Sequence, residues 1–358
     1  MTIRALLLTA CLAASTASHL EAGETGGAAQ PTTDSPAAPL IPLEERYSKL
    51  IEGSPLDKEA LAENEKAFRD AAAEQPGDVR WKIAAAVLKR MQGDAKGSVE
   101  ALSALAKANP NVAEIQNQLG QSRMATMSSD MGFMTMASVA GEAKDAWTAA
   151  VKIDPNHIMA RYALAQYEVQ ARKQGGFLFG SYSKARGHGE ALLKIPGPTA
   201  RFWGLVALGN VAAAQEEWAD MAEKFNAAEA IAPNDGLRSM VLSFHVNALV
   251  RDKKDAKAAL PIVERAVASA DAENFTVYYL RGSVRKELGD CAGASEDFRR
   301  VLEKNPDAQN TRLLLAQCCE QSGARAAAVL HYEEYVKRFP KGQRLAEAQT
   351  ALKRLRKG

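Results

Sequence analysis

The chain is poor in aromatic residues and carries almost no net charge. Aromatics make up 6% of its 358 residues, and 45 Lys and Arg against 43 Asp and Glu leave a formal charge of +2. Nucleic-acid surfaces need a large basic excess, so this balance argues against such a partner. The scarcity of aromatics fits poorly with a β-sandwich, whose strands favour aromatic and branched side chains. The composition instead suits closely crossing helices.

Cysteine is scarce as well, and the usual motifs of metal, redox and catalytic chemistry are missing. The chain has 4 cysteines, none of them in a Cys-x-x-Cys spacing, and its 5 histidines are scattered. It contains no Gly-x-Ser-x-Gly motif and no phosphate-cradling loop. We therefore expect a protein that is not an enzyme and that needs no cofactor.

Apolar runs of membrane-spanning length are missing too. The apolar run at residues 5–14 follows Arg4 and precedes the small residues Ser15, Thr16 and Ala17. It is shorter than the ~20 residues that cross a bilayer, and its flanks are those of an export signal. The sequence predicts a signal peptide over residues 1–17, and hence a periplasmic or secreted protein.

A lipoprotein is the alternative to simple cleavage. Leu8-Thr9-Ala10-Cys11 is similar to a bacterial lipobox, in which Cys11 would be acylated and would become a lipid anchor. In either case residues 18–42, which are rich in Pro, Gly and Ala, predict a flexible linker that forms no core.

The clearest positive feature is a repeat of fixed period near the C-terminus. Six residues recur 34 positions later without a gap: Gly282, Gly289, Ala294, Phe298, Leu302 and Pro306 return as Ala316, Gly323, Ala328, Tyr332, Val336 and Pro340. A period of this length is typical of stacked helical repeats. The small residues suit a close crossing of two helices, the aromatic residue fills the gap beside them, and the proline ends the second helix.

This pattern resembles the tetratricopeptide repeat, and the resemblance covers most of residues 57–340. It implies an all-α fold, namely a right-handed superhelical solenoid of antiparallel helix pairs whose concave groove is lined mainly by first helices. It also implies a role in binding protein or peptide segments without catalysis.

The organisation of the solenoid follows from its prolines and its last apolar stripe. The spacing of the prolines predicts about seven helix pairs over residues 43–340. An apolar stripe then predicts a capping helix over residues 341–358, whose other face is basic. The stripe consists of Leu345, Ala348, Leu352 and Leu355.

Two successive repeats are longer than the others. Pro155 follows Pro110 by 45 residues and Pro196 follows Pro155 by 41, which is 11 and 7 residues more than one repeat. We expect both insertions in turns between first and second helices, side by side on one edge of the solenoid, and we call this the insertion edge. The second insertion is Gly-rich and precedes Lys184-Ala185, which resembles a subgroup of exported bacterial repeat proteins.

The residues of the insertion edge allow three interpretations. Met124, Met127, Met131 and Met134 keep helical spacing and predict a satellite core covered by extended helices. The same methionines, with the aromatics of the second insertion, would otherwise form an exposed patch that docks a partner. A soft-metal site for Cu(I), held by thioether sulfurs, is the third interpretation, although no Cys or His lies within the cluster.

These features predict a non-catalytic interaction scaffold of the bacterial cell envelope. It would bind a protein or peptide at the insertion edge or in the groove, and the alternative is a protein that binds a small apolar ligand or copper at the insertion edge. The candidate residues are Phe177, Leu178, Phe179 and Tyr182 at the edge, and Thr276, Tyr279, Asn310 and Gln317 in the groove.

The three cysteines after the export signal fall in neighbouring repeats. Cys291 begins a second helix, and Cys318 and Cys319 lie late in the next first helix. Because these helices pack antiparallel, a disulfide from Cys291 to Cys318 or Cys319 is one expectation in an oxidising compartment. The other is that all three are small buried apolar residues.

Overall fold

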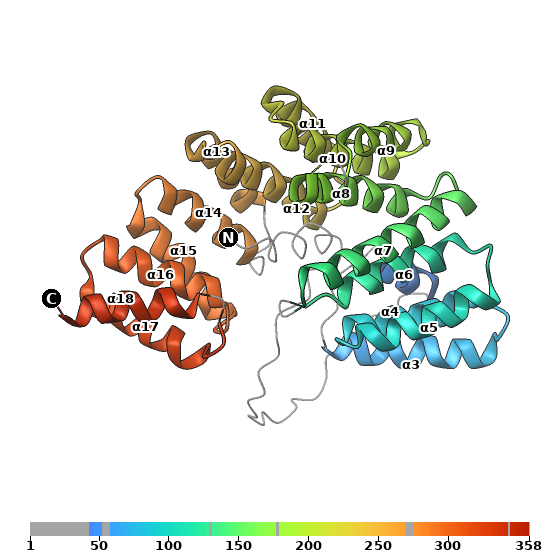
Figure 1. Ribbon diagram of the computed structural model, residues 1–358, viewed down its shortest axis with the longest axis horizontal. Helices are drawn as coiled ribbons and strands as arrows, with labels where there is room; N and C mark the ends of the chain where they lie inside the picture. The colour runs from blue at the N-terminus through green and yellow to red at the C-terminus, as the bar shows by residue number, and fades with distance from the viewer. Residues whose placement is uncertain are drawn as a thin grey trace, which may run out of the picture. The chain divides into compact units, whose positions relative to one another are not determined.

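A computed structural model of the chain describes residues 43–51, 58–128, 131–176, 179–269, 275–342 and 344–357. The predicted signal peptide, the predicted linker and Cys11 lie outside these residues and stay predictions. Within the described part, all regular structure is helical (Figure 1). None of these helices is both long enough and apolar enough to cross a membrane. The predicted all-α fold class is confirmed.

The helices belong to two compact units, one that ends at Gln215 and one that begins at Glu216. The helices of the N-terminal unit are α2 (Leu43–Ile51), α3 (Lys58–Glu74), α4 (Val79–Met91), α5 (Ala95–Ala108), α6 (Ala113–Ala125), α7 (Phe133–Ile153), α8 (Ile158–Gly175), α9 (Tyr182–Lys194) and α10 (Pro198–Ala214). Each helix packs on the next one along the chain, and α4 also contacts α6 while α8 contacts α10. This is how helix pairs stack in a solenoid.

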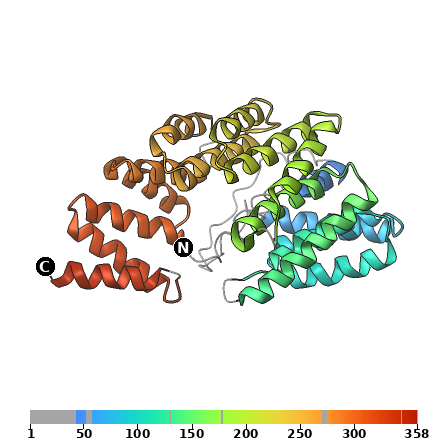
Figure 2. The same cartoon turned by 45° about the horizontal axis from the view of Figure 1, so that its top comes forward.

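The C-terminal unit repeats this arrangement. Its helices are α11 (Trp218–Ala230), α12 (Asp235–Asn247) with the short π-helical extension η3 (Ala248–Asp252), α13 (Ala256–Ser269), α14 (Phe275–Glu287), α15 (Cys291–Lys304), α16 (Gln309–Gln321), α17 (Arg325–Arg338) and α18 (Leu345–Lys357). Successive helices again lie side by side, and α14 contacts both α12 and α16 (Figure 2).

The turn inside a helix pair has a recurring glycine and aspartate. Gly93 and Gly289 have φ of +92° and +83°, a left-handed conformation that glycine adopts without a steric cost. The aspartates that follow them begin α5 and α15: Asp94 Oδ1 accepts the Gly97 N–H at 2.8 Å, and Asp290 Oδ1 accepts the Gly293 N–H at 2.9 Å. In each of these turns the glycine therefore ends the first helix, and the aspartate caps the N-terminus of the second.

The small and aromatic residues of the 34-residue period lie where the repeat pattern predicts. A Cβ added at Gly282 in α14 would lie 2.7 Å from Cε1 of Phe298 in α15, so the ring occupies the space that the missing side chain leaves. The equivalent pair Ala316 and Tyr332 is buried in the same core cluster. The prolines Pro110, Pro155, Pro306 and Pro340 all lie in turns between helix pairs.

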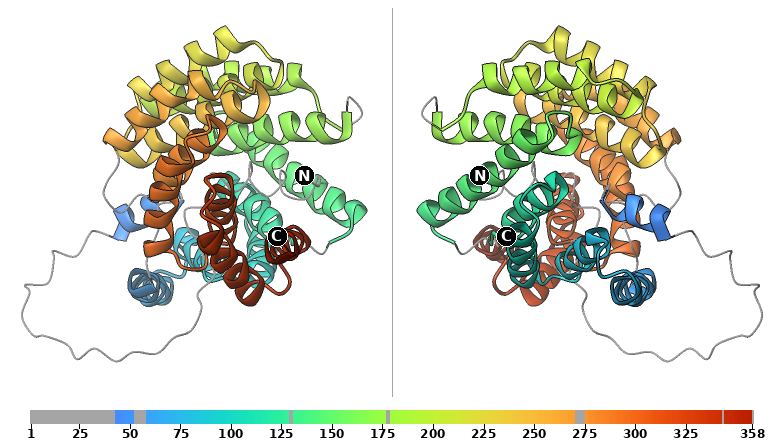
Figure 3. Two further views of the ribbon diagram at one scale, coloured as in Figure 1. Left: turned by 90° about the vertical axis from the view of Figure 1, so that its left-hand side faces the viewer. Right: turned by 90° about the vertical axis from the view of Figure 1, so that its right-hand side faces the viewer.

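The last helix packs along α17 (Figure 3). Ala348, Ala351 and Leu352 of α18 are buried in the core cluster that contains Tyr335, and Leu355 packs against that cluster. The basic side of α18 pairs with the preceding helices, because Arg356 contacts Glu333 at 2.7 Å and Arg354 contacts Glu320. These two arginines of α18 are thus paired with carboxylates of the same unit.

Candidate functional site

The two insertions lengthen helices and leave short turns at one edge of the N-terminal unit. α7 has 21 residues and α8 has 18. The neighbouring helices α4, α5, α6 and α9 have 13 or 14 residues each. The turn after α6 contains Thr126, Met127 and Met131, and the turn after α8 contains Phe179 and Gly180. Phe177 and Leu178, predicted to bind a partner, lie outside the described residues.

The second turn is held against α8. The Ser181 N–H donates to Glu168 Oε2 at 2.9 Å, and Glu168, which is 4% exposed in its side chain, also pairs with Lys144 of α7 at 3.0 Å. Gly180 leaves no room for a side chain, because an added Cβ would lie 2.9 Å from the Ala171 carbonyl carbon. These contacts fix the position of Phe179 relative to α8.

The methionines do not form one continuous helical stripe. α6 ends at Ala125, and the Thr126 Oγ1–H donates to the Arg123 carbonyl at 2.7 Å, so the chain leaves the helix in the middle of the predicted stripe. Met124 and Met127 are buried and Met131 is half-buried, but Met134 is 77% exposed. The predicted satellite core is correct for the first two residues and wrong for Met134, which faces solvent.

An apolar pocket of about 60 Å³ lies between the ends of these helices. It is lined by Met124, Phe133, Ala137, Ala140, Tyr167, Gln170, Ala171, Gln174, Gly175 and Phe179. Phe133 is 45% exposed and Phe179 is 49% exposed, so two rings combine contact with the pocket and access to solvent. Gly175 allows this position of Phe179, because a Cβ there would lie 2.7 Å from the Phe179 Cγ.

The polar groups of the pocket are two amides from one face of α8. Gln170 Oε1 and Gln174 Nε2 are buried, and neither has a hydrogen-bond partner in the part of the chain that the structure describes. One turn earlier on the same face, Gln166 is 4% exposed and its Nε2 also has no partner there. A buried polar group without a partner costs about 1–3 kcal/mol, so this row favours a ligand that supplies hydrogen bonds.

The pocket contains no charged side chain, and the nearest charges are engaged elsewhere. Lys144, which pairs with Glu168, also lies over the ring of Tyr167 with its Nζ 4.9 Å from the ring centroid. Tyr182, predicted as a partner contact, is half-buried and packs instead against Val169 and Val211. Of the two predicted edge residues that the structure describes, Phe179 lines the pocket and Tyr182 does not.

Sequence reasoning missed Gln170, Gln174, Phe133 and Tyr167. Glutamines on a helix normally face water, and nothing in the composition of α8 suggests that these two are buried. The available signal was the spacing of Gln166, Gln170 and Gln174, which repeats every four residues and therefore places three amides on one helix face.

The predicted groove residues are dispersed in the C-terminal unit. Thr276 and Asn310 are exposed, while Tyr279 packs near Phe298 with 6.3 Å between ring centroids. Gln317 borders a wide hollow of about 810 Å³ between α14, α16, α17 and α18, and its Nε2 donates to Glu347 Oε1 at 2.6 Å. The structure therefore does not bring the four groove residues together at one cavity.

The polar groups of this wide hollow are already paired with one another. The Tyr332 hydroxyl donates to Glu320 Oε2 at 3.0 Å, and the same carboxylate is paired with Arg354. Burial, and then this hydrogen bond, raise the pKa of Tyr332. The hollow presents a satisfied polar surface and contrasts with the apolar pocket of the N-terminal unit.

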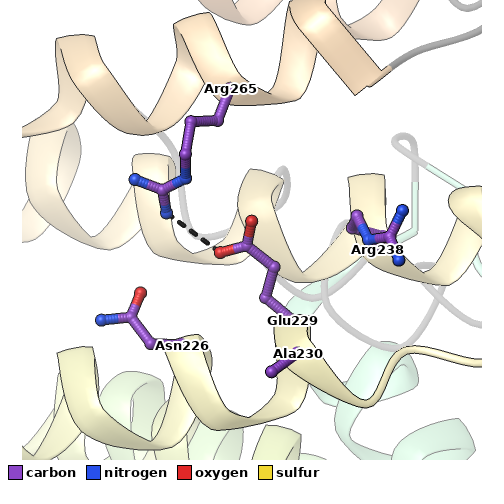
Figure 4. Close-up of a pocket in the computed structure, with 5 residues that line it drawn as sticks. All are labelled: Asn226, Glu229, Ala230, Arg238 and Arg265. Carbon is purple, nitrogen blue, oxygen red and sulfur yellow. Dashed lines mark hydrogen bonds and ion pairs between the residues drawn. The ribbon is translucent and has the colours of Figure 1, made fainter.

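A third hollow of about 490 Å³ lies between α11, α12 and α13 and is polar (Figure 4). Arg265 donates to Glu229 Oε2 at 2.9 Å, and Arg238 donates to Asp235 Oδ1 at 2.7 Å. Because both arginines have a carboxylate partner, the hollow offers no obvious unpaired cation for an anionic ligand.

The three cysteines that the structure describes, Cys291, Cys318 and Cys319, are buried free thiols. Cys291 Sγ donates to Gln321 Oε1 at 2.9 Å. Burial, the charge of Cys291 and a hydrogen bond with Cys291 together raise the pKa of Cys318 to about 12. The sulfurs of Cys291 and Cys318 therefore lie near each other, as predicted for the start of α15 and the end of α16. The disulfide itself stays a prediction.

No metal cluster is evident at any of these places. Among the described residues, no group of three or more His, Cys, Asp or Glu side chains is arranged to hold a metal ion. The methionines Met124, Met127 and Met136 are buried in a cluster with alanines and Trp147, so their thioethers serve as core contacts.

Comparisons with known proteins agree with this architecture. Residues 279–343 match the tetratricopeptide-repeat family. Over these residues the chain therefore contains tetratricopeptide repeats. A search of curated proteins finds no match.

Solved structures resemble the whole fold at low sequence identity. Yeast Tom70 is 13% identical with a TM-score of 0.60, and the match covers 97% of this chain and 68% of that one. A chain of the APC/C hetero-tetramer Cut9–Hcn1 is also 13% identical, with a TM-score of 0.56 over 87% of this chain. This chain spans 55% of the length of that relative. The likeness concerns the fold alone.

Proposed function

We propose that this tetratricopeptide-repeat protein is a non-catalytic scaffold that binds a protein or peptide partner at the insertion edge of its N-terminal unit. The observation that supports this most strongly is the apolar pocket rimmed by Phe133 and Phe179, which also contains the unpartnered amides of Gln170 and Gln174. Exposed apolar groups around a pocket are typical of interaction sites.

The hollow of the C-terminal unit is the weaker candidate for the same role. Its side chains Glu320, Tyr332 and Glu347 already have partners within the unit, so a peptide would have to displace existing hydrogen bonds. At the insertion edge, a partner would gain contacts without breaking any that we observe. This difference favours the edge over the predicted groove.

We further propose that the scaffold acts in the bacterial cell envelope. The support is the export signal predicted over residues 1–17, and the lipid anchor at Cys11 is the alternative form of the same proposal. Mass spectrometry of the mature N-terminus distinguishes them: a chain that starts at Ser18 supports cleavage, and an acylated Cys11 supports the anchor. An intact Met1 in the envelope-free fraction would contradict both.

A capture experiment tests the binding proposal. Mature protein, residues 18–358, is compared with a Phe179→Ser variant and a Leu330→Ser variant in pull-downs from envelope extract. Phe179 is 49% exposed at the pocket, and Leu330 is 53% exposed on α17, so the second variant controls for the loss of a surface apolar group. We expect a partner that is lost with Phe179→Ser and retained with Leu330→Ser. Equal capture by all three proteins would contradict the site.

A small apolar ligand or copper at the same edge is the alternative function predicted from the sequence. Dye binding addresses the first, because fluorescence of a bound apolar dye should fall in Phe179→Ser. A copper titration followed by native mass spectrometry addresses the second, and metal retained by the wild type but lost in Met124→Leu would favour copper over a peptide.

A further inference from the structure

The chemistry of the apolar pocket indicates what part of a partner enters it, and this step rests on the proposed function. The pocket holds about 60 Å³, while a single water needs about 10–15 Å³ on this measure. The space therefore fits roughly four to six non-hydrogen atoms, which is the size of a Leu or Met side chain or of the ring of Phe. Met124 in the lining is unbranched and polarizable, so it adapts to side chains of different shape.

The two unpartnered glutamine atoms are a donor and an acceptor one helical turn apart. Gln170 Oε1 accepts a hydrogen bond, and Gln174 Nε2 donates one. Their positions on α8 differ by four residues, which is about 6 Å along the helix axis. Since the lining contains no Asp, Glu, Lys or Arg, the complementary group is neutral and carries both an N–H and a C=O.

A residue in an extended peptide meets these conditions. Its N–H and C=O point to the same edge of the chain, and its side chain stands at right angles to them. We propose that the pocket binds one apolar side chain of an extended peptide segment. The buried amides of Gln170 and Gln174 rotate towards the peptide on binding, so that the N–H of that residue donates to Gln170 Oε1 and its C=O accepts from Gln174 Nε2. The rings of Phe133 and Phe179 then cover the bound side chain.

Other occupants satisfy fewer of these groups. A hydrocarbon or acyl chain fills the apolar space and leaves both glutamine atoms unpaired, which costs free energy because a buried polar group without a partner has lost its water. A carboxylate or an ammonium would be buried without an opposite charge, which costs more than burying a neutral amide. The amide of a peptide backbone is therefore the occupant that the lining favours.

Blocked tripeptides test this inference directly on the full-length mature chain. The probes are acetyl-Ala-Phe-Ala-amide, the same peptide with an N-methyl group on the Phe nitrogen, and toluene. Binding is followed by the ¹³C-methyl signal of Met124, which is assigned with a Met124→Leu variant. We expect the parent peptide to shift this signal and the N-methylated peptide to bind about tenfold more weakly, because it cannot donate to Gln170.

Isosteric variants provide the second arm. Gln170→Met and Gln174→Met should each lower the affinity for the parent peptide by about tenfold. The affinity for toluene should stay unchanged, since methionine keeps the volume and the helix propensity of glutamine. Gln349→Met, at an exposed position of α18, serves as the matched control and should change neither the peptide affinity nor the toluene affinity. Circular dichroism and a cooperative melt confirm that each variant is folded.

Two results would overturn the inference. One is equal binding of the parent and N-methylated peptides, and the other is glutamine variants that bind the parent peptide normally. If toluene binds and neither peptide does, the pocket takes bare apolar ligands. A partner that still depends on Phe179 in the pull-down would then leave the scaffold function intact while this assignment of the pocket fails.

Discussion

At the scale of single residues, glycines determine how closely two helices of a pair approach. Gly120 of α6 faces the buried Trp147 of α7, and a Cβ at this position would lie 2.7 Å from the Trp147 Cδ1. A Cβ added at Gly141 of α7 would instead meet no atom within 4 Å outside the backbone of its own helix. The same change at these two glycines should therefore have opposite effects.

We expect Gly120→Ala to destabilise the protein and Gly141→Ala to stabilise it. Overpacking costs about 1–3 kcal/mol, which outweighs the gain of about 1 kcal/mol in helix propensity at Gly120. At Gly141 the propensity gain of about 0.5–1 kcal/mol stands alone. The midpoints of urea denaturation measure both, and a Gly120→Ala protein as stable as the wild type would refute the close crossing.

A buried histidine makes stability depend on pH. His245 of α12 is 4% exposed, and burial, then the charge of Arg265, lower its pKa to about 4, although Glu229 acts in the opposite direction. The unfolded chain takes up a proton near pH 6.5 and the folded chain does not, so stability falls as the pH drops from about 6.5 towards 4. The loss is at most about 3 kcal/mol.

Replacing the imidazole should flatten this dependence. His245→Leu removes the titrating ring and keeps an apolar contact for Phe225, whose ring centroid lies 5.5 Å from that of His245. Because burial also lowers the pKa of His188 and His331, we expect a smaller slope rather than none. Denaturation at a series of pH values between 7 and 4 measures the slope, and an unchanged slope in the variant would contradict a neutral His245.

The sequence predicted residues with a steric role better than residues with a binding role. Gly282 and Phe298 were identifiable because the 34-residue period repeats them as Ala316 and Tyr332. Gln170 was not, because its burial depends on the way in which the ends of α7 and α8 meet, and no local pattern encodes that contact. Met134 was misassigned because α6 ends at Ala125, which interrupts the helical spacing of the methionines.

At the scale of elements, the last helix covers the end of the C-terminal unit. Ala348 of α18 is fully buried, whereas Gln349 beside it is exposed. We expect Ala348→Glu to destabilise the unit by about 3 kcal/mol or more, because it places an unpaired charge in the core, and Gln349→Glu to have little effect. Thermal melts of the two variants provide the comparison, and similar melting temperatures would show that α18 is not packed as described.

The start of α15 lies close to the end of α16, which allows a prediction about the oxidation of their cysteines. With glutathione disulfide as the oxidant, which accepts the two electrons, we expect Cys291 and Cys318 to lose their protons and form a disulfide bond. Alkylation of the mature protein after denaturation should then label Cys319 as its one remaining thiol. Such a crosslink stabilises by about 3 kcal/mol. The raised pKa of Cys318 predicts slow oxidation at neutral pH. Peptide mapping that finds Cys291 bonded to Cys319 would contradict this pairing.

Helix positions were largely predictable because each type of boundary has its own chemical signal. Pro110, Pro155, Pro306 and Pro340 lie between helix pairs, and glycine followed by aspartate lies within pairs, as at Gly93-Asp94 and Gly289-Asp290. Before Pro76, where these signals are weak, the structure describes α2 and α3, which lie within the range 43–340 predicted for the helix pairs. The lengths of α7 and α8 were predicted in part: the insertions were expected in turns, whereas the satellite-core interpretation of the methionines expected extended flanking helices.

At the scale of the whole molecule, the chain combines a repeat fold with a net charge close to zero. The balance of 45 basic and 43 acidic residues gives no long-range attraction to a polyanion, so specificity must come from local contacts. In the N-terminal unit, the strongest local candidate is the apolar pocket with its two unpartnered amides. The repeat sequence identifies the fold, and under the proposed function the residues that depart from the repeat select the partner.

Site-specific photo-crosslinking in cells tests this account most directly. Met134 is 77% exposed and follows Phe133 of the pocket, so p-benzoylphenylalanine in its place would report on a bound partner without filling the pocket. Leu330, which is 53% exposed on α17, and the exposed Asn310 are the control positions. We predict a defined adduct from position 134 that disappears with Phe179→Ser, and none from position 330. Adducts from position 310 or 330 without one from position 134 would contradict binding at the insertion edge.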